Sequence, residues 1–140
     1  MSISQRTVIE VIGDSGEGYV NFVSVEANGS YPQPPVFVPI GLPERLFLVV
    51  RGRYTTGPVY GTPMVKVLFS MDTLGLLTDN LMFSVPALVS TDTQSQKLVE
   101  IPNPQGYSHA AVVVTNGSGS PAGFYAALVV YENISEYPTP

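Results

Sequence analysis

Apolar residues recur along the chain with a period of two or in short solid runs, and turn residues separate these segments. Successive strand residues point to opposite faces of a sheet, so this spacing favours strands over helices. Within 64–70, the pattern puts Val65, Val67 and Phe69 on one face and Lys66 on the other. We predict strands at 6–12, 19–26, 35–40, 45–51, 64–70, 80–85, 96–101, 108–115 and 124–132.

The last predicted strand, 124–132, is apolar on both faces. Phe124 and Leu128 fall on one face, and Tyr125 and Val129 fall on the other. A strand of this kind is buried on both sides. We expect one face to meet the core and the other to meet a partner or a loop.

Turn residues separate the predicted strands. Asn116-Gly117 and the glycines that follow it predict an antiparallel hairpin between the last two strands, and Asn28-Gly29 predicts a second turn. The one helical candidate is 71–82, where leucines occur at helical spacing but Gly75 weakens the pattern. One or two helical turns and an irregular loop both remain open for this segment.

Eight or nine short strands without alternating helices predict an all-β fold. We expect an antiparallel β-sandwich, jelly-roll-like, with at most one short helix. The 13 glycines and 13 prolines fit short elements with frequent turns. We expect one domain over 1–140, with short extended arms at 1–5 and 135–140.

Composition narrows the classes of function. A hydrophobic content of 44% with 12% charged residues supports a packed core, and the absence of cysteine excludes disulfides and thiolate metal sites. The net charge is -5 and the six basic residues are spread singly, so we expect no direct nucleic-acid partner. No apolar stretch has the length of a signal peptide or a membrane span, so we expect no membrane partner.

The segment 13–18, GDSGEG, is the best candidate for a catalytic motif, because Ser15 is flanked as in trypsin-like proteases and Gly-Asp-Ser hydrolases. A nucleophilic serine needs a base held by a third group. No histidine precedes Ser15, and Gly106 occupies the place of the hydrolase aspartate before His109. We interpret 13–18 as a turn and predict that the protein is not an enzyme.

Other polar residues have ordinary structural interpretations. A single histidine cannot form a histidine cluster, so we expect His109 to be a half-buried strand residue. We expect no metal site and no cofactor. The loop carboxylates are interpreted as solvated: Asp72, Asp79 and Asp92. The Asn-x-Ser sequons are interpreted as incidental to turns: Asn28, Asn116 and Asn133.

Tyrosines and arginines supply the candidate contact residues, because exposed aromatic rings and guanidinium groups are frequent in interfaces. The segment 51–61 combines both kinds of residue and is the best candidate for a contact loop. The predicted interface residues are Arg51, Arg53, Tyr54, Tyr60, Tyr125, Tyr131 and Tyr137.

Short valine-rich strands, Gly/Ser turns such as VVVTNGSGSPAGFYAALVVYE, and terminal arms together resemble the decoration, or cement, proteins of tailed bacteriophage capsids. The resemblance implies a structural virion protein that assembles in the host cytoplasm. It also implies a homo-oligomer, in the first place a homotrimer, that binds the major capsid protein at the capsid surface. The alternative is a carbohydrate-binding β-sandwich that uses Tyr54, Tyr60 or Tyr107 as a stacking platform.

Overall fold

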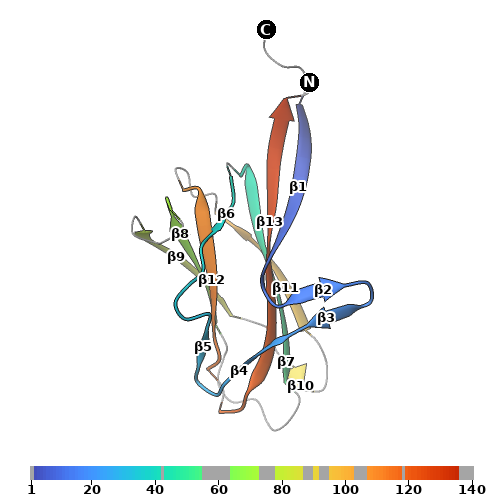
Figure 1. The fold of residues 1–140 in the computed structure, drawn as a ribbon, viewed down its shortest axis with the longest axis vertical. Coiled ribbons are helices and arrows are strands. Elements are labelled where there is room, and N and C mark those ends of the chain that lie inside the picture. The colour runs from blue at the N-terminus through green and yellow to red at the C-terminus, as the bar shows by residue number, and fades with distance from the viewer. Residues whose placement is uncertain are drawn as a thin grey trace.

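The chain folds into two β-sheets that pack face to face, and a small hairpin projects from one of them (Figure 1). The structure is a computed structural model. The described residues form thirteen strands and no helix, so no membrane-spanning helix lies among them. The structure describes residues 2–41, 43–54, 64–72, 78–86, 90–91, 95–102, 107–117 and 119–135.

The larger sheet is built around the long C-terminal strand. β13 lies between β1 and β7, and all three run antiparallel to their neighbours. β11 pairs with β7 along its other edge, and short β4 continues the β1 edge beside β13. A two-residue parallel pairing adds β10 to β7. The strands of this sheet are β1 (Ser2–Ile12), β4 (Val23–Val25), β7 (Arg45–Tyr54), β10 (Ser90–Thr91), β11 (Ser95–Ile101) and β13 (Ala122–Ser135).

The second sheet is antiparallel and centred on two strands. β12 pairs with β8, and β8 pairs with β9. Two short strands, β5 and β6, lie along the other edge of β12. This sheet comprises β5 (Ser30–Tyr31), β6 (Val38–Pro39), β8 (Met64–Ser70), β9 (Thr78–Pro86) and β12 (His109–Thr115).

The core lies between the two sheets and follows the predicted alternation. Val65, Val67 and Phe69 are buried on β8, whereas Lys66 is exposed. From the opposite sheet, β13 contributes Phe124, Ala126, Leu128 and Val130, all at most 2% exposed. This burial of alternate residues from two facing sheets confirms the predicted antiparallel β-sandwich.

The hairpin predicted between the last two strands is wrong, because β12 and β13 belong to different sheets. The buried side-chain amide of Asn116 donates hydrogen bonds to the carbonyl oxygens of Val25, Glu26 and Ser120 at 3.1, 3.2 and 2.9 Å. Its backbone N–H donates to the carbonyl of Gly29 at 2.8 Å. Asn116 therefore holds the crossing between the sheets.

Two further predictions need correction. Residues 78–82 of the helical candidate lie in β9, where Thr78 and Met82 pair with β8, and 73–77 lie outside the described residues. The N-terminal arm is extended as expected, but Ser2–Gln5 pairs with Glu132–Ser135 and so forms the beginning of β1. The C-terminal residues 136–140 lie outside the described part of the chain.

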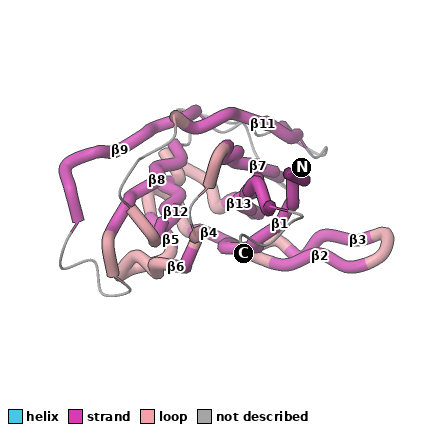
Figure 2. Tube along the Cα trace, turned by 90° about the horizontal axis from the view of Figure 1, so that it is seen from above, coloured by secondary structure: helices cyan, strands magenta, loops and turns pink. Residues whose placement is uncertain are grey.

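The β1–β13 ribbon forms one pole of the molecule. In Figure 1 it extends beyond the body, and Ser2 at the beginning of β1 pairs with Ser135 at the end of β13. At the other end of β1, the chain leaves the sheet, forms the hairpin of β2 (Asp14–Gly16) and β3 (Tyr19–Asn21), and returns as β4. Figure 2 shows this hairpin standing away from the two sheets.

Candidate functional site

The outer face of the larger sheet, the face turned away from the second sheet, carries the candidate site. Residues paired across neighbouring strands share a face. Val8 is opposite Val129, which is opposite Phe47. In the next row, Ala127 is opposite Val49, which is opposite Leu98. Apolar side chains therefore form two adjacent rows, which together cross β1, β13, β7 and β11.

We call Val8, Phe47, Val49, Leu98 and Val129 the apolar strip. Val8 is 49% exposed and Leu98 is 60% exposed, one at each margin of the strip. The other three residues are half-buried. Aliphatic side chains left in water across four strands cost free energy in the isolated protein, and such a surface is typical of an interaction site.

Charged residues border one end of the apolar strip. The Arg45 guanidinium donates two hydrogen bonds to the Glu100 carboxylate, at 3.1 and 2.8 Å, and lies 5.0 Å from the centre of the Phe47 ring. Phe47 in turn meets Tyr131 edge to face, with ring centroids 5.6 Å apart. The hydrogen bond from Arg45 lowers the pKa of Glu100. Both side chains are exposed, so solvent screens this pair and it contributes little to the stability of the fold.

At the other end of the apolar strip, Glu10 fastens the β2–β3 hairpin to the sheet. Its Oε2 accepts hydrogen bonds from the hydroxyls of Ser15, at 2.6 Å, and Tyr125, at 2.8 Å. The Ser15 bond first, and the Tyr125 bond second, lower the pKa of Glu10. Burial, and then the bond to Glu10, raise the pKa of Tyr125.

The direction of the hairpin depends on Gly13. Its φ of 72° lies in the left-handed region, and a Cβ there would collide with the backbone oxygen of Asn21. Within the hairpin, the Asn21 amide donates to Asp14 at 2.6 Å. The segment 13–18, which the sequence predicted as a turn, forms one only at its end: Asp14–Gly16 is the strand β2, and residues 17–18 make the turn of the hairpin.

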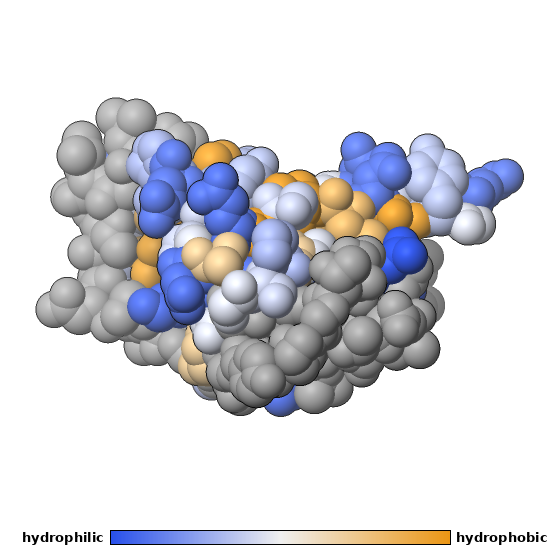
Figure 3. All heavy atoms as spheres, turned by 90° about the horizontal axis from the view of Figure 1, so that it is seen from below, coloured by the Kyte–Doolittle hydropathy of each residue, from blue (hydrophilic) through white to orange (hydrophobic). Residues whose placement is uncertain are grey.

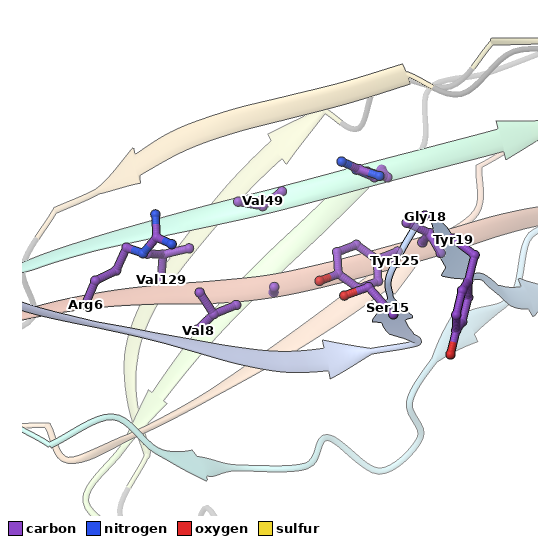
Figure 4. A pocket seen from close by; sticks show the side chains of 12 residues that line it. Arg6, Val8, Ser15, Gly18, Tyr19, Val49, Tyr125 and Val129 are labelled. Atoms are coloured by element: carbon purple, nitrogen blue, oxygen red, sulfur yellow. The ribbon is translucent and has the colours of Figure 1, made fainter.

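A pocket of about 500 Å³ lies in the corner between the hairpin and the outer face (Figure 4). The apolar strip supplies part of its floor through Val8, Val49 and Val129. Tyr19, which is 57% exposed, lines the pocket from the hairpin. Arg6 and Arg51 supply positive charge, and Figure 3 shows hydrophobic side chains where the hairpin meets the body.

Four of the predicted interface residues lie on this outer face. Arg51 is opposite Tyr125 in the register and both line the pocket. Arg53 lies one row further along β7, and Tyr131 lies beside Phe47 at the other end. Tyr125 is only 7% exposed, so most of its ring packs within the chain itself. The side chain of Tyr54, and the residues Tyr60 and Tyr137, lie outside the described part of the chain.

The prediction that β13 is covered on both faces is confirmed at its beginning. Tyr125 and Ala127, on the outer face, are 7% and 2% exposed. Tyr125 hydrogen-bonds to Glu10 at the base of the hairpin, whereas Val129 further along remains half-buried. Of the two alternatives that the sequence left open for this face, a loop or a partner, the structure shows the chain's own hairpin at the beginning of the strand, and the partner stays a prediction.

The sequence analysis did not predict the apolar strip, nor the hydrogen bonds by which Glu10 holds the hairpin to the sheet. The available signal was one aliphatic residue between polar residues on the solvent face of an edge strand. Arg6-x-Val8-x-Glu10 in β1 and Gln96-x-Leu98-x-Glu100 in β11 both have this pattern.

Other sequence candidates have local structural roles. The Ser15 hydroxyl donates to Glu10, whereas His109 begins β12 in the other sheet and its Nδ1 lies 2.7 Å from the Ser108 hydroxyl oxygen. Tyr107 packs against the core, with its ring centroid 6.1 Å from that of Phe69. Asn116 of the second sequon is fully buried.

The remaining acidic candidates do not form a group in the described structure. The Ser70 hydroxyl donates to Asp72 at 3.2 Å. The side chain of Asp79 and the whole of Asp92 lie outside the described part of the chain. Among the described residues, no three acidic, histidine or cysteine side chains are placed to hold a metal ion.

Comparison with known proteins identifies the fold. No protein-family model and no curated protein matches the chain. A solved structure of the infectious bursal disease virus particle matches 96% of this chain and 32% of its own chain, with a TM-score of 0.60 and 12% identity. A mutant VP2 protein of the same virus, in derived particles, matches 96% of this chain and 33% of its own, with a TM-score of 0.58 and 11% identity.

A carbohydrate-active protein shares the fold as well. The CBM22-1 and GH10 modules of endo-1,4-β-D-xylanase 10B from Clostridium thermocellum, complexed with xylohexaose, match 92% of this chain and 26% of their own. The TM-score is 0.52 and the identity is 8%. The chain thus spans about a third or less of these proteins. At these identities the likeness establishes a shared jelly-roll-like β-sandwich fold and no more.

Proposed function

We propose that this chain is a structural virion protein: a decoration, or cement, subunit that binds the major capsid protein on the head of a tailed phage. It acts through self-association and surface burial, without catalysis and without a cofactor. The observation that carries the proposal is the apolar strip, whose marginal residues Val8 and Leu98 are 49% and 60% exposed. The fold shared with a viral capsid protein supports it.

The mechanism of such a protein is burial. Covering apolar surface contributes about 25 cal/mol for each Å² removed from water. A subunit that lays its apolar strip across neighbouring capsid proteins therefore lowers the free energy of the assembled shell and slows its separation. The charged residues at the border of the strip, such as Arg45 and Glu100, fix the orientation of contact more than its strength.

Labelling of virus particles tests the proposal. Antibodies against the purified chain should decorate the heads of the virus that encodes it, and the wild-type chain should cosediment with heads that lack it. Leu98→Glu should abolish cosedimentation. The matched control is Met71→Glu, because Met71 is 56% exposed on the bend after β8. Heads without label, or equal binding by both variants, would refute the proposal.

The corner pocket favours carbohydrate binding as the second candidate. Tyr19 offers an exposed ring for stacking on a sugar, and Ser15, Arg6 and Arg51 supply polar groups elsewhere in the lining of the pocket. A glycan array should then show binding that Tyr19→Ala removes. Tyr31→Ala is the matched control, because Tyr31 is 40% exposed on β5 in the other sheet. An array without signal favours the virion protein.

A further inference from the structure

The outer edge of β1 is open to another strand. Within the described residues, β13 is the only strand that pairs with β1, so the other edge of an 11-residue strand has no partner there. Gln5, Arg6, Thr7 and Val8 are all exposed. The described β1 contains no proline or lysine, the residues that commonly prevent edge strands from pairing. A bulge between Glu10 and Ile12 ends its regular part.

The sequence of this edge complements itself. Arg6, Val8 and Glu10 share the outer face. In an antiparallel pair of two β1 strands with Val8 opposite the partner's Val8, Arg6 lies opposite the partner's Glu10, and Glu10 lies opposite the partner's Arg6. Both pairs carry opposite charges, which stabilise cross-strand neighbours. Moving the centre to Thr7 or Ile9 leaves both charges opposite uncharged residues.

The two charges are available to a second copy. Arg6 has no hydrogen bond or ion pair within the described part of the chain, and it lies about 13 Å along the strand from Glu10 of its own copy. Both side-chain hydrogen bonds to Glu10 use Oε2, and the Ser15 backbone also bonds to this carboxylate. Within the regular part of β1, this register pairs residues 6–10 of the two copies. The hairpin begins beyond Ile12 and so lies outside this paired segment.

We propose that two copies of this chain associate through their β1 edges, in antiparallel register with Val8 on the two-fold axis and Arg6 opposite the partner's Glu10. The two large sheets then become one, and the apolar strips of both copies become continuous through the paired Val8 side chains. This inference rests on the proposed function for its biological role, because it names the first contact of the oligomer. It replaces the trimer with a two-fold dimer as the expected unit.

The mass in solution gives the first test, and it needs no capsid. Light scattering after size-exclusion chromatography should give about 30 kDa at high concentration, twice the 15.0 kDa of the chain, and should fall on dilution. A mass of one chain at every concentration would overturn the proposal, and so would a mass of three chains. Failure to bind capsids would leave this result unaffected, so the two proposals fail separately.

Charge reversal tests the register. Arg6→Glu, or Glu10→Lys, places like charges opposite each other in two places and should raise the dimer dissociation constant about tenfold. Mixing the two variants should restore association as a heterodimer, because every pair is then complementary. The control Lys66→Glu makes the same charge change on β8 and should dimerise normally. Two variants that remain monomeric on mixing, although both fold, would contradict the register.

A cysteine bridge tests the same register without touching Glu10. The chain has no cysteine, so Val8→Cys introduces a single thiol. Residues directly opposite in an antiparallel pair lie within the Cα separation that a disulfide spans. Mild oxidation should therefore convert Val8→Cys to a covalent dimer quickly, whereas Leu98→Cys, on the opposite margin, should react slowly. Equal rates for the two variants would overturn the proposed contact.

Discussion

The phenol of Tyr125 donates a 2.8 Å hydrogen bond to the carboxylate of Glu10, joining β13 to β1 where the hairpin leaves the sheet. The same carboxylate oxygen accepts the hydroxyl of Ser15 on β2. One acidic side chain thus connects two strands of the sheet with the hairpin. Because the hairpin and the outer face together line the pocket, this connection sets the shape of the candidate site.

Removing the phenol oxygen should loosen the hairpin and leave the fold intact. Tyr125→Phe keeps the ring but loses the bond to Glu10, so the hairpin should open more often. Cleavage after Glu17, at the hairpin turn, by a glutamate-specific protease should accelerate, while the far-ultraviolet spectrum stays unchanged. Tyr31→Phe is the control on β5. Equal cleavage rates for the two variants would show that the bond does not hold the hairpin.

Acid should weaken the same connection. Hydrogen bonds from Ser15 and Tyr125 lower the pKa of Glu10 from 4.5, so the folded protein binds this proton less readily than the unfolded chain. The stabilisation is complete above the unfolded pKa and is lost as the pH falls through the folded pKa. The melting temperature of the wild type should therefore drop further on acidification than that of Glu10→Gln. Parallel drops would refute this role for Glu10.

Truncation of β13 should have different effects on its two faces. Leu128 is 0% exposed in the core, so Leu128→Ala should lower the free energy of unfolding by about 2–5 kcal/mol. Val129, its neighbour on the outer face, is half-buried, so Val129→Ala should cost clearly less. Denaturant titration of both variants measures the difference. Similar losses would contradict the assignment of the two faces.

Asn116 should be the most sensitive polar residue of the crossing between sheets. Asn116→Ala removes the donor for three carbonyl oxygens, and unsatisfied buried groups cost about 1–3 kcal/mol. The midpoint of urea unfolding should fall accordingly. Asn21→Ala removes an exposed hydrogen bond, from the Asn21 side-chain amide to Asp14, and should lower the midpoint much less. Equal midpoints for these two variants would contradict the anchoring role.

Local alternation predicted the strands well. The predicted strand 64–70 coincides with β8, and 96–101 and 108–115 differ from β11 and β12 by one residue at their start. The segment 19–26 divides at Phe22 into β3 and β4, because the chain leaves the hairpin and joins the sheet there. The segment 35–40 contributes only β6. Alternation records which residues face the core, but it does not specify where a strand changes its partner.

The pairing of strands depended on contacts distant in sequence. The Asn-Gly turn at 116–117 is a hairpin signal, yet Asn116 binds carbonyls about 90 residues earlier, at Val25 and Glu26, and the chain crosses between sheets. Four predicted interface residues share the outer face because odd-numbered residues of β7 and β13 point outward together. Val8 and Leu98 share this outer face only because the strand order places β1 beside β13 and β11 beside β7.

Cryo-electron microscopy of the virus particle would show directly whether this chain is a decoration subunit. We expect β-sandwich density on the outside of the head, with the apolar strip covered by a capsid protein or by another copy of this chain. Particles that lack the chain, or that carry it with Val8 and Leu98 facing solvent, would contradict the proposed function.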